Sequence, residues 1–77
     1  MTIILNAARM GTKEEAHEYL KKAFGFPDYY GGNLDALADC LGELDNVKIR
    51  ICNTEEAGEY LERLMPVFRD HAEVSTG

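Results

Sequence analysis

Three acidic side chains recur at four-residue intervals in the middle of the chain. Asp35, Asp39 and Glu43 would lie on one face of a helix, because residues i and i+4 are neighbours on a helix surface. Like charges at this spacing destabilise a helix by about 0.2–0.5 kcal/mol per pair. No lysine or arginine lies between Lys22 and Lys48 to neutralise them locally. The row is therefore either a solvated helix face or a surface kept acidic for a basic partner.

Catalysis would need a base, an acid, a nucleophile or a metal ion held together, and the sequence offers few candidates. The two histidines, His17 and His71, lie in different segments without a partner nearby in sequence. His17 falls off the apolar stripe of its segment, so we expect a surface histidine. Asp35 and Asp39 could form a carboxylate pair, or could hold a divalent cation with Asp70. No residue that would orient them is identifiable, so we predict no enzyme, no metal site and no cofactor.

A turn with two tyrosines and two glycines precedes the acidic row. Segment 27–32 reads PDYYGG, in which the proline restricts the backbone and the glycines free it. Tyr29 and Tyr30 cannot both point inward from a tight turn, so at least one should be exposed. Glycines before a helix can cradle a phosphate, but the residues that follow are acidic and include no lysine. Asn33 is a good N-cap for the helix that follows.

The composition describes a small acidic domain. A chain of 77 residues is long enough for one domain, which we expect to span residues 1–77. Its 8 basic and 14 acidic residues give a formal net charge of −6. Because phosphate binding depends on basic patches, this charge argues against nucleic acid as a direct partner. It favours a basic protein partner, or simply solubility.

Neither a membrane span nor a secretion signal is recognisable. The longest apolar run is far too short to cross a bilayer, and no basic N-terminal region precedes a long apolar one. We therefore expect no membrane contact and a cytoplasmic location. Cys40 and Cys52 fall on different predicted elements without CxxC spacing, so we expect two free thiols in a reducing compartment.

Hydrophobic periodicity places these residues on alternating strands and helices. Strands are predicted at 2–6 and 47–52, with a short edge strand at 73–76. Helices are predicted from a capping box at Thr12 to Phe24, over the acidic segment 33–44, and from Thr54 onward, with a kink or restart at Pro66. Tyr19 and Tyr60 lie on helical apolar stripes and are expected in the core. The apolar wall opposite the acids comprises Leu34, Leu37, Cys40, Leu41 and Leu44.

The element order predicts the topology. Segment 47–52 alternates apolar and polar residues, so one face of the strand is buried and the other, with Lys48 and Arg50, is wet. Helices are then expected on one face of the sheet only. Crossover connections between parallel strands are right-handed, so strands covered on one face advance in one direction. The prediction is a two-layer α/β domain whose three-stranded parallel sheet has the order 1-2-3.

Residues 27–41, PDYYGGNLDALADCL, resemble the barstar family of intracellular inhibitors of the secreted ribonuclease barnase. The element order agrees along the whole chain, and residues 67–70, VFRD, are similar to the last helix of the family. The resemblance implies a barstar-like fold and an inhibitor that plugs the active site of a basic extracellular ribonuclease. It also implies a 1:1 complex and a protein that is monomeric when free.

The resemblance assigns roles to individual residues. The residue at Asp39 replaces a substrate phosphate among basic enzyme side chains, and the one at Asp35 contacts basic residues beside it. The tyrosine at Tyr29 packs on the catalytic histidine of the enzyme, and the acid at Asp70 reaches a peripheral arginine. The full predicted partner-binding set is Tyr29, Tyr30, Gly31, Asn33, Asp35, Ala38, Asp39, Gly42, Glu43 and Asp70.

The sequence also departs from the family's prototype, which has tryptophans at the positions of Ala38 and Leu44 and a glycine at that of Glu43. Large aromatic residues are typical interface anchors, so the departures imply a cognate nuclease of the chain's own. Two alternatives remain open. One is a non-inhibitory interaction module that binds another basic protein through the same acidic face, and the other is a small metal- or ligand-binding domain.

Overall fold

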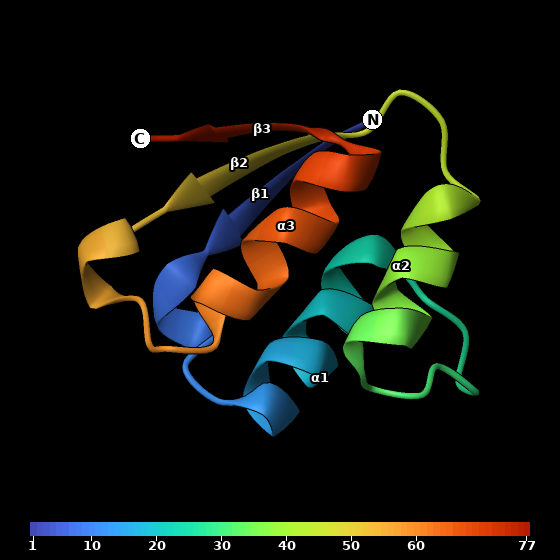
Figure 1. Cartoon of the computed structure of the whole chain (residues 1–77), viewed down its shortest axis with the longest axis horizontal. Coiled ribbons are helices and arrows are strands. Elements are labelled where there is room, and N and C mark those ends of the chain that lie inside the picture. Colours follow the sequence, from blue (N-terminus) through green and yellow to red (C-terminus); the bar gives the residue numbers. More distant parts are fainter.

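Three short strands form a parallel sheet with the second strand at its centre. The structure is a computed structural model that describes all 77 residues. Strand β1 (Thr2–Asn6) pairs with β2 (Lys48–Cys52), and β2 pairs with β3 (Glu73–Thr76), both in parallel. The order β1-β2-β3 confirms the predicted topology (Figure 1).

All three α-helices lie on the same side of this sheet (Figure 1). They are α1 (Lys13–Phe24), α2 (Leu34–Gly42) and α3 (Leu61–His71), and two single-turn 3-10 helices, η1 (Ala7–Arg9) and η2 (Thr54–Glu56), follow β1 and β2. On the covered face Ile49 and Ile51 are buried, whereas on the other face Ile4 is 65% exposed. This difference confirms that one face is open to solvent. No helix combines the length and hydrophobicity needed to cross a membrane.

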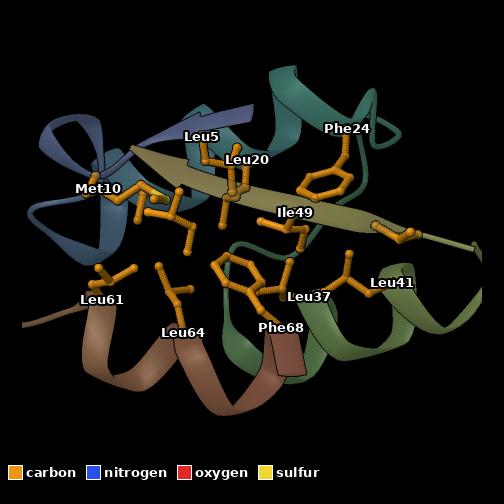
Figure 2. Close-up of a cluster of buried hydrophobic side chains, with 14 of the residues drawn as sticks. Leu5, Met10, Leu20, Phe24, Leu37, Leu41, Ile49, Leu61, Leu64 and Phe68 are labelled. Atoms are coloured by element: carbon orange, nitrogen blue, oxygen red, sulfur yellow. The ribbon is translucent and has the colours of Figure 1, made fainter. Parts of the chain in front are cut away.

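The hydrophobic core lies between the sheet and the helices. Figure 2 shows side chains from α2 and α3 pointing toward β2, namely Leu37, Leu41, Leu64 and Phe68. Leu20 from α1 joins the same cluster. Because these side chains are fully buried, they fix how each helix is rotated about its own axis.

Side-chain caps set where α1 and α2 begin. The Thr12 hydroxyl accepts a hydrogen bond from the Glu15 amide at 3.2 Å, and the Asn33 side chain accepts one from the Ala36 amide at 2.8 Å. The Glu15 carboxylate reaches back to the Gly11 amide at 3.3 Å. Both N-caps agree with the prediction from sequence.

The predicted start of the last helix at Thr54 is wrong, because the chain makes only the single turn η2 there and α3 begins at Leu61. Asn53, just before η2, adopts a left-handed conformation with φ 57°, and Ala57, just after it, is extended and ends the helical backbone. The restart predicted at Pro66 does not occur, since α3 continues through it. Pro66 and Glu62 are both exposed, so water can satisfy the Glu62 carbonyl that Pro66 cannot.

Gly58, between η2 and α3, packs directly against the backbone of Gly11. A Cβ atom at position 58 would lie 2.7 Å from the Gly11 carbonyl oxygen and 2.9 Å from its Cα. Real Cβ atoms do not approach so closely, and neither neighbour is a flexible side chain. Only glycine therefore allows the link before α3 to lie against the link before α1.

We predict that Gly58→Ala lowers the free energy of unfolding by roughly 1–3 kcal/mol, because the two backbones must separate to admit the methyl group. Urea unfolding followed by far-UV circular dichroism measures the change. Gly11→Ala is the matched control, because its Cβ would lie no closer than 3.6 Å to another residue. Equal stabilities for the two variants would contradict the predicted backbone contact.

Candidate functional site

The acidic row projects from α2 into solvent. Asp35, Asp39 and Glu43 are all exposed, and none takes part in an ion pair. The two ion pairs of the structure, Lys21–Asp28 and Lys22–Glu18, involve other carboxylates. Asp70 on α3 is likewise exposed and unpaired. These four carboxylates, like most of the acidic side chains of the protein, therefore form no internal ion pair.

The opposite side of α2 explains why the acids point outward. Leu37 and Leu41 are fully buried, while Leu34, Cys40 and Leu44 are half-buried against the same core. Because residues three or four apart share a helix face, rotating α2 to bury an acid would expose this wall. Burial, followed by the nearby Glu43 and Asp39 carboxylates, raises the pKa of the Cys40 thiol. Neither Cys40 nor Cys52 takes part in a disulfide.

The turn before α2 holds one tyrosine outside and one against the protein. The Tyr29 side chain is 86% exposed, whereas Tyr30 is half-buried beside Phe26 with ring centroids 4.9 Å apart. This arrangement confirms the expectation that at least one of them is exposed. Gly32 has φ +66°, a left-handed conformation that favours glycine, just before Asn33 caps α2.

His17 is buried, so its predicted position at the surface is wrong. Only 3% of its surface is exposed, and both ring nitrogens have partners. The Nδ1 atom is 2.6 Å from the Tyr30 hydroxyl, and the Nε2 atom is 2.6 Å from the Tyr60 hydroxyl. The prediction from sequence failed because it rested on the apolar stripe of α1, which indicates only the side of the helix that packs on the sheet. The turn and the start of α3 cover the adjacent side of α1.

Burial sets the charge state of this cluster. Burial first, and the nearby Lys13 cation second, lower the pKa of His17 below its usual value of 6.5. Burial also raises the pKa of the Tyr30 and Tyr60 hydroxyls, which therefore keep their protons at neutral pH. The cluster is thus a neutral histidine between two protonated tyrosines.

The remaining predicted site residues do not all belong to one patch with the acidic row. Gly31, Asn33 and Gly42 are exposed, and Ala38 is half-buried. Gly42 lies at the contact of α2 with α3, because a Cβ atom there would be 3.7 Å from His71 Cε1. Asp70, which precedes His71, belongs to the same end of the helix pair.

A hollow of about 560 Å³ borders the N-terminal end of the row. It is lined by residues at the starts of all three α-helices: Lys13, Asn33, Leu34, Asp35, Tyr60 and Arg63. Although Lys13 and Arg63 share the hollow with Asp35, neither forms an ion pair with it. Cations therefore limit the acidic surface at this end.

The side chains of the site are not arranged as a metal-binding cluster. No group of three or more His, Cys, Asp or Glu side chains is placed to hold a metal ion. The buried His17 is enclosed by its two tyrosines, and the Cys40 thiol near Asp39 and Glu43 has a raised pKa, so it is a weak nucleophile at neutral pH. The candidate site residues include acids without ion pairs on α2 and, in the turn before it, an exposed tyrosine and two glycines.

Comparisons with known proteins identify similar chains. The model of the family described as "Barstar (barnase inhibitor)" matches residues 1–76. A protein of Bacillus subtilis (strain 168) named "Putative ribonuclease inhibitor YrdF" is 51% identical over 39 residues. The aligned region covers 51% of this chain and 43% of that relative's length, so less than half of the relative is represented.

The lowered pKa of His17 predicts a pH-dependent stability. As the pH falls below about 6.5, the unfolded chain takes up a proton on this histidine that the folded chain does not. The free energy of unfolding should therefore decrease from about pH 7.5 toward the lowered folded pKa, by at most ~1.4 kcal/mol per pH unit. His17→Gln should flatten this slope.

Urea unfolding between pH 5.5 and 7.5 tests the slope. His71→Gln is the matched control, because His71 is exposed and should leave the wild-type slope in place. A His17→Gln variant whose stability falls as steeply as that of the wild type would refute this assignment.

Proposed function

The chain belongs to the barstar family of barnase inhibitors, and on this basis we propose that it is a stoichiometric inhibitor of a basic secreted ribonuclease. Family membership confirms the resemblance of residues 27–41, and the family consists of inhibitors rather than enzymes. The observation that carries the proposal is the row of unpaired carboxylates on α2, together with the exposed Tyr29 in the turn before this helix.

A ribonuclease active site binds a polyanion and is therefore lined by cations. Asp35, Asp39 and Glu43 present negative charges on one helix face, at the spacing of successive helical turns. None of the three forms an internal ion pair, although Lys13 and Arg63 share a hollow with Asp35, so all three can pair with enzyme side chains. In this proposal Asp39 takes the place of a substrate phosphate, and Asp35 and Glu43 pair with cations beside it.

Small residues next to Asp39 allow close approach. Ala38 precedes it, and Gly42 lies one helical turn further on, so neither neighbour stands between the carboxylate and a partner. Tyr29 offers a large exposed ring that can pack on the enzyme, as aromatic anchors do in many interfaces. We propose that the partner-binding surface comprises Tyr29, Tyr30, Gly31, Asn33, Asp35, Ala38, Asp39, Gly42, Glu43 and Asp70.

The remaining features of the proposal follow from charge and size. Residues 1–77 act as one unit around a single core, and the chain is monomeric until it forms a 1:1 complex. Its net charge of −6 matches a basic nuclease. We place the protein in the cytoplasm, where it neutralises the enzyme before export or after entry.

The alternative function is a non-inhibitory module that binds a different basic protein through the same face. The absence of a large aromatic residue at Ala38 favours it, since such residues often anchor tight interfaces. Binding without any effect on RNA cleavage would distinguish this function from inhibition.

A titration tests the proposed function. The chain is added to barnase, and to other basic ribonucleases including the product of any neighbouring reading frame, while cleavage of a fluorogenic RNA is followed. We expect one of these enzymes to lose its activity at a 1:1 ratio. If none loses activity, inhibition is wrong, and binding without inhibition would instead support the interaction module.

We predict that Asp39→Ala weakens ribonuclease binding by at least ~2–5 kcal/mol, a range for buried interfacial charges that draws on the barnase–barstar complex itself. Without this carboxylate, enzyme cations would be buried with no counter-charge. Folding stability should be unchanged or rise by about 0.2–0.5 kcal/mol, since repulsion from Asp35 and Glu43 is relieved. Enzyme titration and urea unfolding measure the two effects.

Glu55→Ala provides the matched control for charge. It removes the same charge from an exposed site in η2, which lies far from α2 in Figure 1. This variant should inhibit as tightly as the wild type. Tight inhibition by Asp39→Ala as well would exclude phosphate mimicry by Asp39.

We predict that association with the inhibited ribonuclease is fast and sensitive to salt. The net charge of −6 and the clustered acids should steer a basic enzyme toward the site. Association rate constants should reach about 10⁸–10⁹ M⁻¹s⁻¹ at low salt, a range for steered pairs that includes barnase–barstar, against about 10⁵–10⁶ M⁻¹s⁻¹ without steering. Stopped-flow rates that do not change between 20 mM and 500 mM salt would rule out steering.

A further inference from the structure

The turn that carries Tyr29 has few polar connections to the rest of the protein. Apart from the Asn33 cap of α2, the only side-chain hydrogen bond from residues 27–33 to another element joins the Tyr30 hydroxyl to His17 Nδ1 at 2.6 Å. The Tyr30 amide bonds within the turn, to the Pro27 carbonyl at 3.0 Å. The ion pair of Asp28 with Lys21 spans 3.7 Å and is exposed, so it contributes little. His17 is therefore the main polar anchor of the turn.

The same histidine is bound from the other side by a residue distant in sequence. Tyr60 immediately precedes α3, and its hydroxyl lies 2.6 Å from His17 Nε2. The Tyr60 carbonyl accepts hydrogen bonds from the amides of Arg63 and Leu64, so its backbone belongs to the first turn of α3. The chain Tyr30–His17–Tyr60 thus joins the turn, α1 and α3.

The hydrogen bonds that join Tyr30, His17 and Tyr60 have a direction, because a neutral histidine carries only one ring proton. A neutral imidazole has one N–H group and one nitrogen lone pair, so it donates to one tyrosine and accepts from the other. Which nitrogen carries the proton is decided jointly by the two hydroxyls. If the Tyr60 hydroxyl is removed, Nε2 loses its partner in a site that is only 3% exposed. A buried unpaired polar atom is costly, and a change of tautomer alone gives Nε2 no partner, so the loss favours a different orientation of the ring.

We propose that Tyr60 is a positioning residue for the inhibitory turn, because its hydroxyl fixes the proton arrangement of His17 and thereby the side chain of Tyr30. This inference rests on the proposed inhibition, since the turn presents Tyr29 to the enzyme. Tyr60 also lines the hollow that Asn33 and Asp35 line at the start of α2. The start of α3 therefore helps to orient the binding surface without itself being a contact for the nuclease.

The experiment compares Tyr60→Phe with Tyr19→Phe. The control also removes a hydrogen-bonding hydroxyl, since Tyr19 accepts a bond from the Asn6 amide at 2.9 Å, but it does so away from the turn. Both variants should lose comparable folding stability. Only Tyr60→Phe should raise the inhibition constant, by about three- to tenfold, measured with a ribonuclease that the wild type inhibits.

Three further measurements separate positioning from a merely structural loss. Imidazole ¹⁵N chemical shifts should report an altered His17 tautomer or ring environment in Tyr60→Phe but not in Tyr19→Phe. The amides of Tyr30, Gly31 and Gly32 should exchange with deuterium several-fold faster in Tyr60→Phe. In a double-mutant cycle, Tyr30→Phe and Tyr60→Phe should be less than additive, because both act through the same histidine.

The outcomes distinguish this inference from the proposed function. If the wild type and Tyr19→Phe inhibit, and Tyr60→Phe inhibits equally well with unchanged amide exchange, Tyr60 does not position the turn. If the wild type inhibits no ribonuclease, the proposed function fails. The ¹⁵N and exchange measurements on the free protein then still decide whether Tyr60 controls the turn.

Discussion

The packing of α2 on the hydrophobic core determines which of its side chains are exposed to solvent. With nine residues, α2 is shorter than the roughly 12–15 residues at which isolated helices are even marginally stable, so it depends on tertiary contacts. Leu37 and Leu41 supply these contacts beneath it. Because Leu37 and Leu41 are buried, the Asp35 and Asp39 side chains point into solvent, where neither forms an ion pair.

The row of acids destabilises α2, and interactions at the start of this helix offset part of the loss. Carboxylates one turn apart repel each other, and Glu43 lies at the helix end where a negative charge is least favourable. The Asn33 cap and the position of Asp35 in the first turn compensate in part, since both act at the positive end of the helix. A sequence selected for stability alone would place lysine or arginine among these acids. Their absence agrees with the proposal that this surface binds a basic partner.

The buried cluster of Tyr30, His17 and Tyr60 restricts the turn that precedes α2. Tyr29 is almost completely exposed, yet its neighbour Tyr30 is bound to a histidine that is almost completely buried. An exposed ring on a flexible turn would lose conformational freedom on binding. Anchoring Tyr30 to His17 restricts the turn before any partner arrives. Pre-organisation of this kind favours tight binding from a small surface.

The local sequence pattern was sufficient to predict much of the fold and the common face of the acids. Alternation at Lys48 and Arg50 predicted the one-sided sheet, the caps at Thr12 and Asn33 predicted helix starts, and the spacing of the acids predicted their common face. Only the tertiary structure decided that His17 is buried and that the helix expected at Thr54 begins at Leu61. Both depend on segments distant in sequence, because Tyr30 and Tyr60 enclose His17, and the backbone of Gly11 lies against Gly58. Periodicity reports which side chains face a core, but it does not report which other segments come to cover a helix.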